Sequence, residues 1–409
     1  MDAPRTERPR VVLGVAGGIA AYKACELLRQ LTETGHDVRV VPTRSALEFV
    51  GAPTWAALSG HPVTASTWDD VHEVPHVAIG RAAELVVVAP ATADLLAKAA
   101  HGLADDLLTN TLLTARCPVV LAPAMHTEMW EHPATRANVA LLRERGVLVL
   151  EPAVGRLTGA DTGKGRLPEP EEIARVCRQV LARGVRPADL AGRTVVVTAG
   201  GTREHLDPVR YLGNRSSGKQ GHALARAAVA RGARVVLVTA AGLPDPAGAD
   251  VVRVTSAQEL RDATLVAAED ADAVVMAAAV ADYRAVERSA TKRKKTAHLT
   301  LELVQNPDVL VELVAARTAG QVLVGFAAET GDALGSVLDH GRAKLARKGC
   351  DLLVVNEVGE AGHPTGFEGE QNAATVLGAD GSATEVPLGS KDALADAVWD
   401  LVAARLPER

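Results

Sequence analysis

Short apolar runs alternate with amphipathic, helix-like segments through residues 1–183. The apolar runs are RVVLGVA, DVRVVP, AELVVVAP, PVVLAPA and GVLVLEP. Strands that are apolar at every position are expected where helices cover both faces of a parallel sheet. Residues 1–183 are therefore predicted to form a doubly wound α/β domain.

The same alternation restarts at Arg193 and continues to the end of the chain. Its apolar runs are RTVVVTA, ARVVLVTA, DVVRV, DAVVMAAA, QVLVGFA and DLLVVN, and GADG then predicts the turn of a terminal hairpin. Residues 193–409 are predicted to form a second doubly wound parallel-sheet domain, with the Pro- and Gly-marked segment 184–192 as linker. The two halves share no fixed-period repeat, which favours two fused domains over a solenoid.

Residues 154–170, VGRLTGADTGKGRLPEP, interrupt the pattern of the first half. They show no periodicity and contain several glycines, so a long mobile loop is predicted. Loops of this length in compact domains are often lids.

Composition narrows the possible partners and the compartment. Charged residues make up 23% of the chain and the formal net charge is −6, so no global basic field exists to hold nucleic acid or an anionic membrane. No stretch of 18 apolar residues occurs. The four cysteines form no C-x-x-C pair, which argues against a disulfide framework or a structural zinc site. We expect a cytoplasmic protein.

Paired glycines follow the first strand of each half, in GVAGG and TAGGT. A strand that ends in such a turn lets the backbone approach a phosphate at a helix start, where N–H groups and the helix dipole favour an anion. Neither turn matches the G-x-G-x-x-G or G-x-x-x-x-G-K-[ST] fingerprint. A tight turn that needs glycine only for packing is therefore an open alternative.

Polar side chains also follow other predicted strands of the first half. Thr92, His126 and Trp130 come after strand ends, where open parallel sheets bind ligands. His76, in PHVAIG, adds a group suited to acid–base chemistry. For each histidine taken alone, an inert surface role is the favoured interpretation.

Longer motifs carry a family resemblance. GVAGGIAAYK, APATADLL, GLADDLLT and PAMHTEMW resemble motifs of the flavin-binding phosphopantothenoylcysteine decarboxylases. In the second half, TAGGTREHLDPVRYLGNRSSGKQG, AAAVADY, NPDV, VGFAAET and KGCDLLVVN resemble the CTP-dependent phosphopantothenate-cysteine ligases. The order matches that of the bacterial bifunctional enzymes of coenzyme A synthesis. The resemblance implies a flavodoxin-like flavoprotein domain followed by a Rossmann-like CTP-binding ligase domain.

The ligase resemblance implies activation of a carboxylate as an acyl-cytidylate, with loss of pyrophosphate from CTP. Lys292, in the basic run TKRKK, matches the family's activating lysine, and Asp282 would bind the nucleotide with help from Mg²⁺. Asn214 would support attack on the acyl-cytidylate. Arg203, Arg210 and Arg215 are chemical candidates for the substrate phosphate. The remaining positions implied for CTP are Met276, Ala277, Ala278, Pro307, Asp308, Val309, Leu310, Phe326, Lys344 and Lys348.

The decarboxylase resemblance implies FMN, which oxidises the substrate thiol, allows CO₂ to leave and returns the electrons. His76 matches the catalytic histidine and Met125 is implied to contact the substrate. The positions implied for FMN are Gly17, Gly18, Thr43, Ser45, Thr92, Asp105 and Asp106.

Two positions depart from the decarboxylase pattern. His126 replaces an asparagine that helps to bind substrate, and Gly159 stands where the lid normally carries a proton-donating cysteine. The hypothesis is that His126 takes over a substrate contact or the proton transfer, with a water under the closed lid as the rival donor.

Two alternatives to the bifunctional enzyme follow from these departures and from the glycine turns. One is an active ligase with a flavin-binding but catalytically silent first domain that serves regulation or assembly. The other, a nicotinamide-dependent oxidoreductase, is disfavoured because the dinucleotide fingerprint is missing. The resemblance also implies a homo-oligomer, with trimeric flavin domains and dimeric ligase domains.

Overall fold

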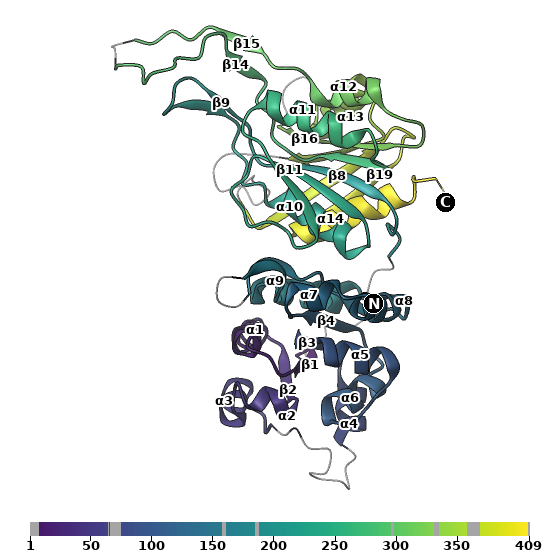
Figure 1. Ribbon diagram of the computed structural model, residues 1–409. Helices are drawn as coiled ribbons and strands as arrows, with labels where there is room; N and C mark the ends of the chain where they lie inside the picture. The colour runs from purple at the N-terminus through teal and green to yellow at the C-terminus, as the bar shows by residue number, and fades with distance from the viewer. Residues whose placement is uncertain are drawn as a thin grey trace. The chain divides into compact units, whose positions relative to one another are not determined.

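The chain divides into two compact units, Met1–Pro187 and Ala188–Arg409 (Figure 1). The computed structural model describes residues 8–63, 65, 75–157, 161–184, 188–295, 298–330, 335–357 and 369–407. Each unit has its own sheet, and each is described separately below.

The sheet of the first unit has five parallel strands in the order β2-β1-β3-β4-β5. This is the strand order of flavodoxin-like folds. The strands are β1 (Arg10–Val15), β2 (Asp37–Pro42), β3 (Leu85–Ala91), β4 (Val119–Pro123) and β5 (Leu148–Val149). The helices are α1 (Ala21–Glu33), α2 (Arg44–Leu47), α3 (Ala52–Ser59), α4 (Pro75–Ala82), α5 (Ala93–His101), α6 (Leu107–Thr114), α7 (Thr127–Glu131), α8 (Pro133–Glu144) and α9 (Pro170–Arg183).

Helices cover both faces of this sheet, which explains why its strands are apolar at every position. Along β1, Val11 and Leu13 pack with α1 and α9, whereas the intervening Val12 packs with α5, α6 and α8 on the other face. Side chains alternate across a strand, so two buried faces require an uninterrupted apolar run.

The second unit has an eight-stranded sheet in the order β12-β11-β8-β13-β16-β17-β18-β19. The first six strands of this order are parallel and follow the 3-2-1-4-5-6 arrangement of Rossmann-like folds. They are β8 (Thr194–Ala199), β11 (Arg234–Thr239), β12 (Ala249–Arg253), β13 (Ala273–Met276), β16 (Val322–Glu329) and β17 (Leu352–Glu357). The antiparallel hairpin of β18 (Gln371–Gly378) and β19 (Ala383–Ser390) completes the sheet, as GADG predicts.

Helices cover both faces of the second sheet as well. On one face α10 (Lys219–Ala230) and α14 (Lys391–Ala403) pack together, and the Trp399 indole N–H donates to the carbonyl oxygen of Leu224 at 2.8 Å. The other face is covered by α11 (Ala257–Ala268), α12 (Val309–Ala316) and α13 (Val337–Lys348). The prediction of two α/β domains with parallel sheets is confirmed.

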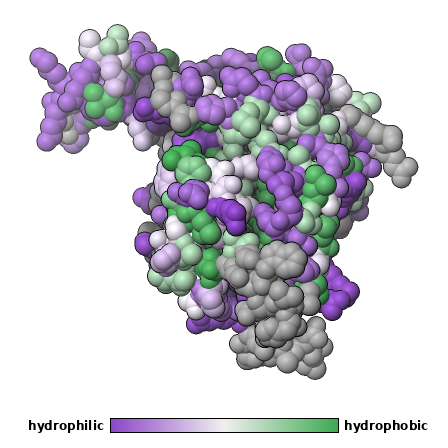
Figure 2. Space-filling model, turned by 60° about the horizontal axis from the view of Figure 1, so that its bottom comes forward, coloured by the Kyte–Doolittle hydropathy of each residue, from purple (hydrophilic) through white to green (hydrophobic). Residues whose placement is uncertain are grey.

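Two short ribbons extend from the second unit. One pairs β9 (Arg203–His205) with β10 (Tyr211–Gly213), and the other pairs β14 (Tyr283–Ala285) with β15 (Leu303–Gln305). Figure 1 shows the chain between β14 and β15 projecting away from the sheet, and Figure 2 shows a mainly hydrophilic surface there.

The segment predicted as an irregular loop, 154–170, instead contains an antiparallel hairpin. Its strands are β6 (Ala153–Arg156) and β7 (Thr162–Arg166). Because this hairpin does not bury one face in a core, its sequence lacks the alternation that would reveal it. Gly159 and its two neighbours lie outside the described residues.

Residues 188–192, which the sequence predicts as part of a linker, pack against the second unit. Leu190 is fully buried, and Asp189 pairs with the buried Arg231 of the second unit. Residues 185–187 of the predicted linker lie outside the described part of the chain. In that described part, no helix is long and apolar enough to cross a membrane.

Candidate functional site

A cavity of about 900 Å³ lies at the carboxyl ends of β1, β2 and β3 in the first unit. Ligands of open parallel sheets bind where the strand order reverses, which here is between β1 and β3. Its lining includes every position implied for the flavin except Gly18. The lining residues are Ala16, Gly17, Thr43, Arg44, Ser45, Leu47, Ala65, Thr92, Ala93, Asp94, Leu95, Lys98, Asp105, Asp106 and Met129.

Gly17 brings the backbone close to the loop after β2. A Cβ added to Gly17 would lie 2.3 Å from the Cβ of Ser45, whereas one added to Gly18 would meet only Thr92 Cγ2, at 3.9 Å. Any side chain at residue 17 would therefore push the loop after β2 away from the turn after β1.

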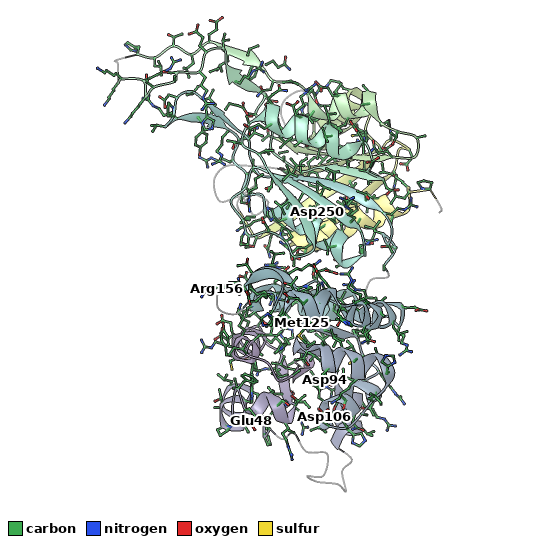
Figure 3. The ribbon with its side chains drawn as sticks, viewed as in Figure 1. Glu48, Asp94, Asp106, Met125, Arg156 and Asp250 are labelled. Carbon is green, nitrogen blue, oxygen red and sulfur yellow. The ribbon has the colours of Figure 1, made fainter. Side chains whose placement is uncertain are left out.

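At the carboxyl edge of this sheet, polar side chains cap the amino ends of three helices. Thr43 and Thr92 accept the N–H groups of Ala46 and Leu95 at 3.2 and 3.3 Å and so cap α2 and α5. Asp106 caps α6 by accepting the N–H of Thr109 at 2.7 Å. Figure 3 shows Asp94 and Asp106 at this part of the unit. The three capping side chains therefore fix the start of each helix, and these helix starts form part of the cavity wall.

Lys98 and Arg44 are two cations of the cavity that sequence reasoning missed, and Lys98 is the one held by carboxylates within the cavity. Its ammonium group lies 3.0 Å from Asp105 and 3.2 Å from Asp94. The hydrogen bond to Asp105 raises the pKa of Lys98, and the same bond lowers the pKa of Asp105. The spacing of Asp94 and Lys98 on α5 was the available signal. The contact to Asp105 depends on tertiary structure.

His76 does not line the cavity of its own chain. It lies in the first turn of α4, where its carbonyl oxygen accepts the Thr114 hydroxyl of α6 at 2.8 Å. Its ring atom Nδ1 is buried and has no hydrogen-bond partner among the described residues. The His76 backbone is thus tied to α6, and its ring has one buried nitrogen without a partner in the described structure.

Met125 and His126 lie between β4 and α7, beside the β6–β7 hairpin. The N–H of Met125 donates to the carbonyl oxygen of Gly165 at 2.9 Å. His126 occupies the residue before α7 and its side chain is exposed. The predicted substrate segment is therefore in direct contact with the segment predicted as a lid.

In the second unit, the residues implied for CTP begin at the corresponding switch point, between β8 and β13. Met276 ends β13, and the N–H of Ala278 donates to the Thr198 hydroxyl at the end of β8, at 3.0 Å. The N–H of Ala281 donates to the Thr202 hydroxyl at 2.9 Å. Sequence reasoning missed both threonines because each acts on the backbone of the loop after β13, a contact that only the fold creates.

Asn214 lies beside this switch point. Its side-chain amide donates to the carbonyl oxygen of Val280 at 2.9 Å. A Cβ added to Gly201 would lie 2.4 Å from the carbonyl oxygen of Asn214. The structure thus brings the TAGGT turn, the NRSSGK loop and the AVADY segment together.

Lys344 and Lys348 lie on α13, and each already pairs with a carboxylate. Lys344 bonds Glu329 at 2.9 Å, and Lys348 pairs with Asp308, the residue before α12. Leu310 is buried in α12, and Phe326 is part of β16. The positions implied for CTP on α12, β16 and α13 are therefore neighbours.

Asp282 and Lys292 are exposed and belong to the projecting ribbon. The carbonyl oxygen of Asp282 accepts the N–H of Asn306 at 2.8 Å, and Lys292 follows in the segment between β14 and β15. Across the described ranges, no three His, Cys, Asp or Glu side chains gather as metal ligands.

The three candidate phosphate arginines have different surroundings. Arg203 lies over the Tyr211 ring at 6.0 Å and donates to the carbonyl oxygen of Ala240 at 3.4 Å. Arg210 pairs with Asp207 at 3.2 Å. Arg215 is exposed, next to Asn214.

Comparison with known proteins places these two sites in a family. The family model "Flavoprotein" matches residues 3–182, and the model "DNA/pantothenate metabolism flavoprotein C-terminal domain" matches residues 190–406. A coenzyme A biosynthesis bifunctional protein of Mycolicibacterium smegmatis is 60% identical over 98% of this chain and 98% of its own length. Its counterparts in Mycobacterium tuberculosis and Vibrio cholerae are 60% and 43% identical, each over 96% of this chain and over 96% and 97% of their own lengths.

The resemblance predicted from the motifs is confirmed by these matches, which extend over both units at high identity. The chain belongs to the family of coenzyme A biosynthesis bifunctional proteins.

Proposed function

We propose that the second unit joins cysteine to phosphopantothenate with CTP and that the first unit decarboxylates the product to phosphopantetheine with FMN. In this proposal residues 1–183 are the decarboxylase domain and residues 193–409 the ligase domain. The observation that carries the proposal is the cavity at the β1/β3 switch point, which gathers residues quoted from several separate flavin motifs.

The ligation requires an activated carboxyl group. A substrate carboxylate oxygen attacks the α-phosphorus of CTP and expels pyrophosphate, and the cysteine amine then attacks the acyl carbon and expels CMP. We assign Met276–Ala278 and Pro307–Leu310 to nucleotide binding, and Lys344 and Lys348 to the triphosphate. Phosphate binding would replace the carboxylates of Glu329 and Asp308 as partners of these lysines.

Asn214 is proposed to stabilise the oxyanion that forms when the amine attacks. Its amide is fixed by the bond to Val280, so it could donate its second hydrogen without reorganisation. Lys292 is assigned to carboxylate activation, and the three arginines to the substrate phosphate. Mg²⁺ would bind the phosphates of CTP, with Asp282 as its one protein ligand, because Mg²⁺ commonly uses few carboxylates together with substrate phosphates.

The cavity of the first unit fits a flavin mononucleotide. Ligand cavities measure roughly 300–1,000 Å³, and the close approach of Gly17 to Ser45 leaves backbone facing this space. The amino ends of α5 and α6 suit a phosphate group. When bound, FMN would supply the reversible oxidation that the thiol substrate needs before CO₂ can leave.

The chain's own residues would then orient the substrate. Met125 and His126 are assigned to substrate contact, and His76 to the catalytic proton transfer. Because His76 does not line the cavity of its own chain, we propose that a second copy supplies it in a homo-oligomer. Exposed apolar residues such as Ile19, Phe49 and Leu113 support self-association, and Figure 2 shows hydrophobic residues among hydrophilic ones on the visible surface.

Two measurements on the purified chain test the proposal. We expect a yellow protein with flavin absorbance bands, and we expect CMP and pyrophosphate to form only when CTP, phosphopantothenate and cysteine are all present. A colourless protein that also forms no CMP would exclude both halves of the proposal.

The role of His126 is tested by two substitutions. His126→Asn restores the residue common in the family, and His126→Ala removes any side-chain proton donor. We expect His126→Ala to release less CO₂ and to accumulate the oxidised enethiol product. Unchanged behaviour in both variants would exclude His126 from the mechanism and favour a water as proton donor.

One observation favours a second function for the first unit. The sequence has no cysteine between Cys117 and Cys177, so the lid lacks the usual proton donor. A flavin-binding but catalytically silent first unit would retain flavin absorbance and release no CO₂ from added phosphopantothenoylcysteine. A cytoplasmic location stays a prediction.

A further inference from the structure

We infer that Glu151 is a positioning residue for the decarboxylase site, because it fixes the β6–β7 hairpin against Met125–Thr127. The inference rests on the proposed function of the first unit. The hairpin strands and the loop after β4 lie in the described part of the chain.

Glu151 lies between two cations at the base of the hairpin. Its carboxylate is 2.8 Å from Arg143 of α8 and 2.6 Å from Lys164 of β7, and its side chain is only 17% exposed. Burial by itself raises the pKa of Glu151, but the contacts with the positively charged Lys164 and Arg143 outweigh it and lower the pKa. The carboxylate is therefore charged at neutral pH and ties β7 to a helix of the core.

The residues on either side of Lys164 contact the proposed substrate segment through their backbone. The carbonyl oxygen of Gly165 accepts the N–H of Met125 at 2.9 Å. A Cβ added to Gly165 would lie 2.2 Å from the carbonyl oxygen of Met125, and one added to Gly163 would lie 2.2 Å from the Thr127 hydroxyl. A shift of Lys164 would therefore move Gly163 and Gly165, whose backbone contacts Thr127 and Met125.

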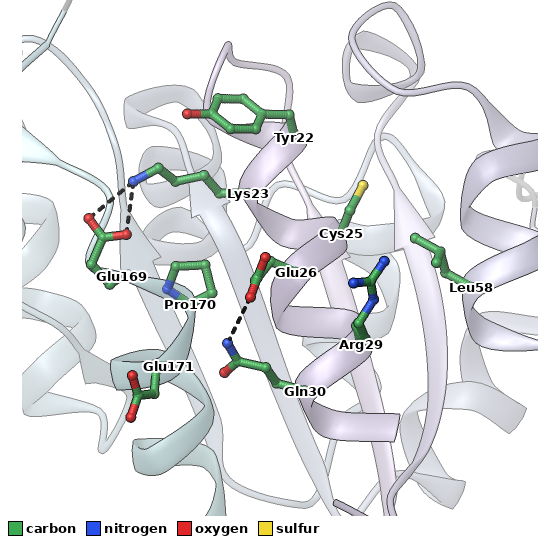
Figure 4. Close-up of a pocket in the computed structure, with 10 residues that line it drawn as sticks. All are labelled: Tyr22, Lys23, Cys25, Glu26, Arg29, Gln30, Leu58, Glu169, Pro170 and Glu171. Atoms are coloured by element: carbon green, nitrogen blue, oxygen red, sulfur yellow. Dashed lines mark hydrogen bonds and ion pairs between the residues drawn. The ribbon is translucent and has the colours of Figure 1, made fainter. Parts of the chain in front are cut away.

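A second carboxylate anchors the far end of β7. Glu169 pairs with Arg166 of β7 and lies 3.2 Å from Lys23 of α1, as the dashed lines between Lys23 and Glu169 show in Figure 4. Glu169 is 57% exposed, so its ion pairs are weaker than those of Glu151. Glu151, whose side chain is largely buried, is therefore expected to determine the position of β7.

The test compares wild type with Glu151→Gln, Glu151→Asp, Lys164→Gln and the double variant Glu151→Gln/Lys164→Gln. Glu171→Gln is the matched control, because its carboxylate is 76% exposed and pairs only with Arg175, at 3.6 Å, in the described structure. All variants are made in the full chain. Each is assayed for CO₂ release from added phosphopantothenoylcysteine, for CTP-dependent ligation and for flavin absorbance.

We expect Glu151→Gln to lower kcat/KM for decarboxylation about tenfold, mainly through KM, with ligation and flavin content unchanged. Glu151→Asp should recover part of the loss. The double variant should be no worse than the more damaged single variant, because both substitutions break the same Glu151–Lys164 pair. A value for Glu151→Gln within twofold of wild type, or losses that multiply in the double variant, would overturn the inference.

Hydrogen exchange at the Met125 amide separates this inference from the proposed function. Glu151→Gln should exchange this hydrogen at least tenfold faster than wild type and Glu171→Gln should not. If wild type releases no CO₂, the decarboxylase proposal fails while faster exchange still supports the positioning role. Unchanged exchange in Glu151→Gln refutes the positioning role whatever the activity.

Discussion

Gly17 and Gly18 are adjacent in sequence and have opposite surroundings. The space beside Gly17 is filled by Ser45, including its backbone, whereas the space beside Gly18 is open to a contact at 3.9 Å. Crowding by backbone cannot be relieved by a change of rotamer. The two positions therefore form a matched pair for testing whether close backbone approach holds the flavin.

We expect Gly17→Ala to lose most of its bound flavin and Gly18→Ala to retain it. Forcing the loop after β2 away from Gly17 costs roughly 1–3 kcal/mol, as overpacking does elsewhere, and it changes the cavity wall. The measurement is the ratio of flavin to protein absorbance after purification. Equal flavin content in the two variants would contradict the steric argument, and CTP-dependent ligation serves as the internal control.

His222 is a buried titratable residue that follows the NRSSGKQG motif directly but is not itself a predicted ligand. It lies on α10 and is 1% exposed, and its ring contacts the Thr239 hydroxyl at 3.5 Å. Burial, assisted by the charges of Arg226 and Arg253, lowers the pKa of His222 from 6.5 to about 4. The folded chain thus holds this imidazole in its neutral form.

Between pH 6.5 and about 4 the unfolded chain binds more protons at His222 than the folded chain does. Stability therefore falls as pH falls through this window, by about 2 kcal/mol between pH 7 and pH 5. His222→Gln should remove that part of the pH dependence, measured by urea unfolding with hydrogen exchange of the α10 segment. His298 is exposed, so His298→Gln should keep the pH dependence of stability. An equal pH dependence in His222→Gln and His298→Gln would exclude His222 as its cause.

At the scale of elements, acidic residues lie just before several strands of both sheets, and their carboxylates accept an N–H group of the neighbouring strand. Glu84, just before β3, accepts the first N–H of β1 at 3.0 Å. Asp272, just before β13, accepts the N–H of Thr194 in β8 at 2.8 Å, and Asp351, just before β17, accepts that of Leu323 in β16 at 2.7 Å. Each carboxylate satisfies a backbone donor at the sheet edge opposite the candidate sites.

Asp272→Ala should destabilise the second unit by about 3 kcal/mol, because it leaves both a strand N–H and Arg193 without this carboxylate. The Arg193–Asp272 pair is only 10% and 15% exposed. Asp250→Ala is the control. Asp250, labelled in Figure 3, pairs with Arg234 at the surface, and its loss should cost less than about 0.5 kcal/mol. Urea unfolding gives the free energy of unfolding of both variants. Similar decreases in the two would refute the stabilising role of Asp272 at the start of β13.

The elements that sequence predicts best are those that bury two faces. β1 and β8 are apolar at almost every position because helices cover both sides of their sheets. The β6–β7, β9–β10 and β14–β15 ribbons carry no such signal, since backbone pairing defines them without a core face. Thr92 was predictable because it follows a strand, whereas Lys98 enters the site through a contact to Asp105 that only the fold creates.

At the scale of the whole molecule, both units place their candidate sites at the same point of a parallel sheet. The first places its cavity where strand order reverses between β1 and β3, and the second gathers its candidate residues where order reverses between β8 and β13. Each glycine turn follows the strand that begins its sheet. Because each unit has its own core, damage to one site is expected to leave the other intact.

This independence predicts complementation between defective chains. Asn214→Ala should lose ligation while still decarboxylating added phosphopantothenoylcysteine, and His76→Asn should show the reverse. Mixed in solution with phosphopantothenate, cysteine and CTP, the two variants should together release CO₂, because the intermediate formed by one can diffuse to the other. Each variant alone is the control, and CO₂ release is followed with cysteine labelled in its carboxyl carbon. No release from the mixture, when each variant keeps its remaining activity, would mean that the intermediate must pass within one assembly.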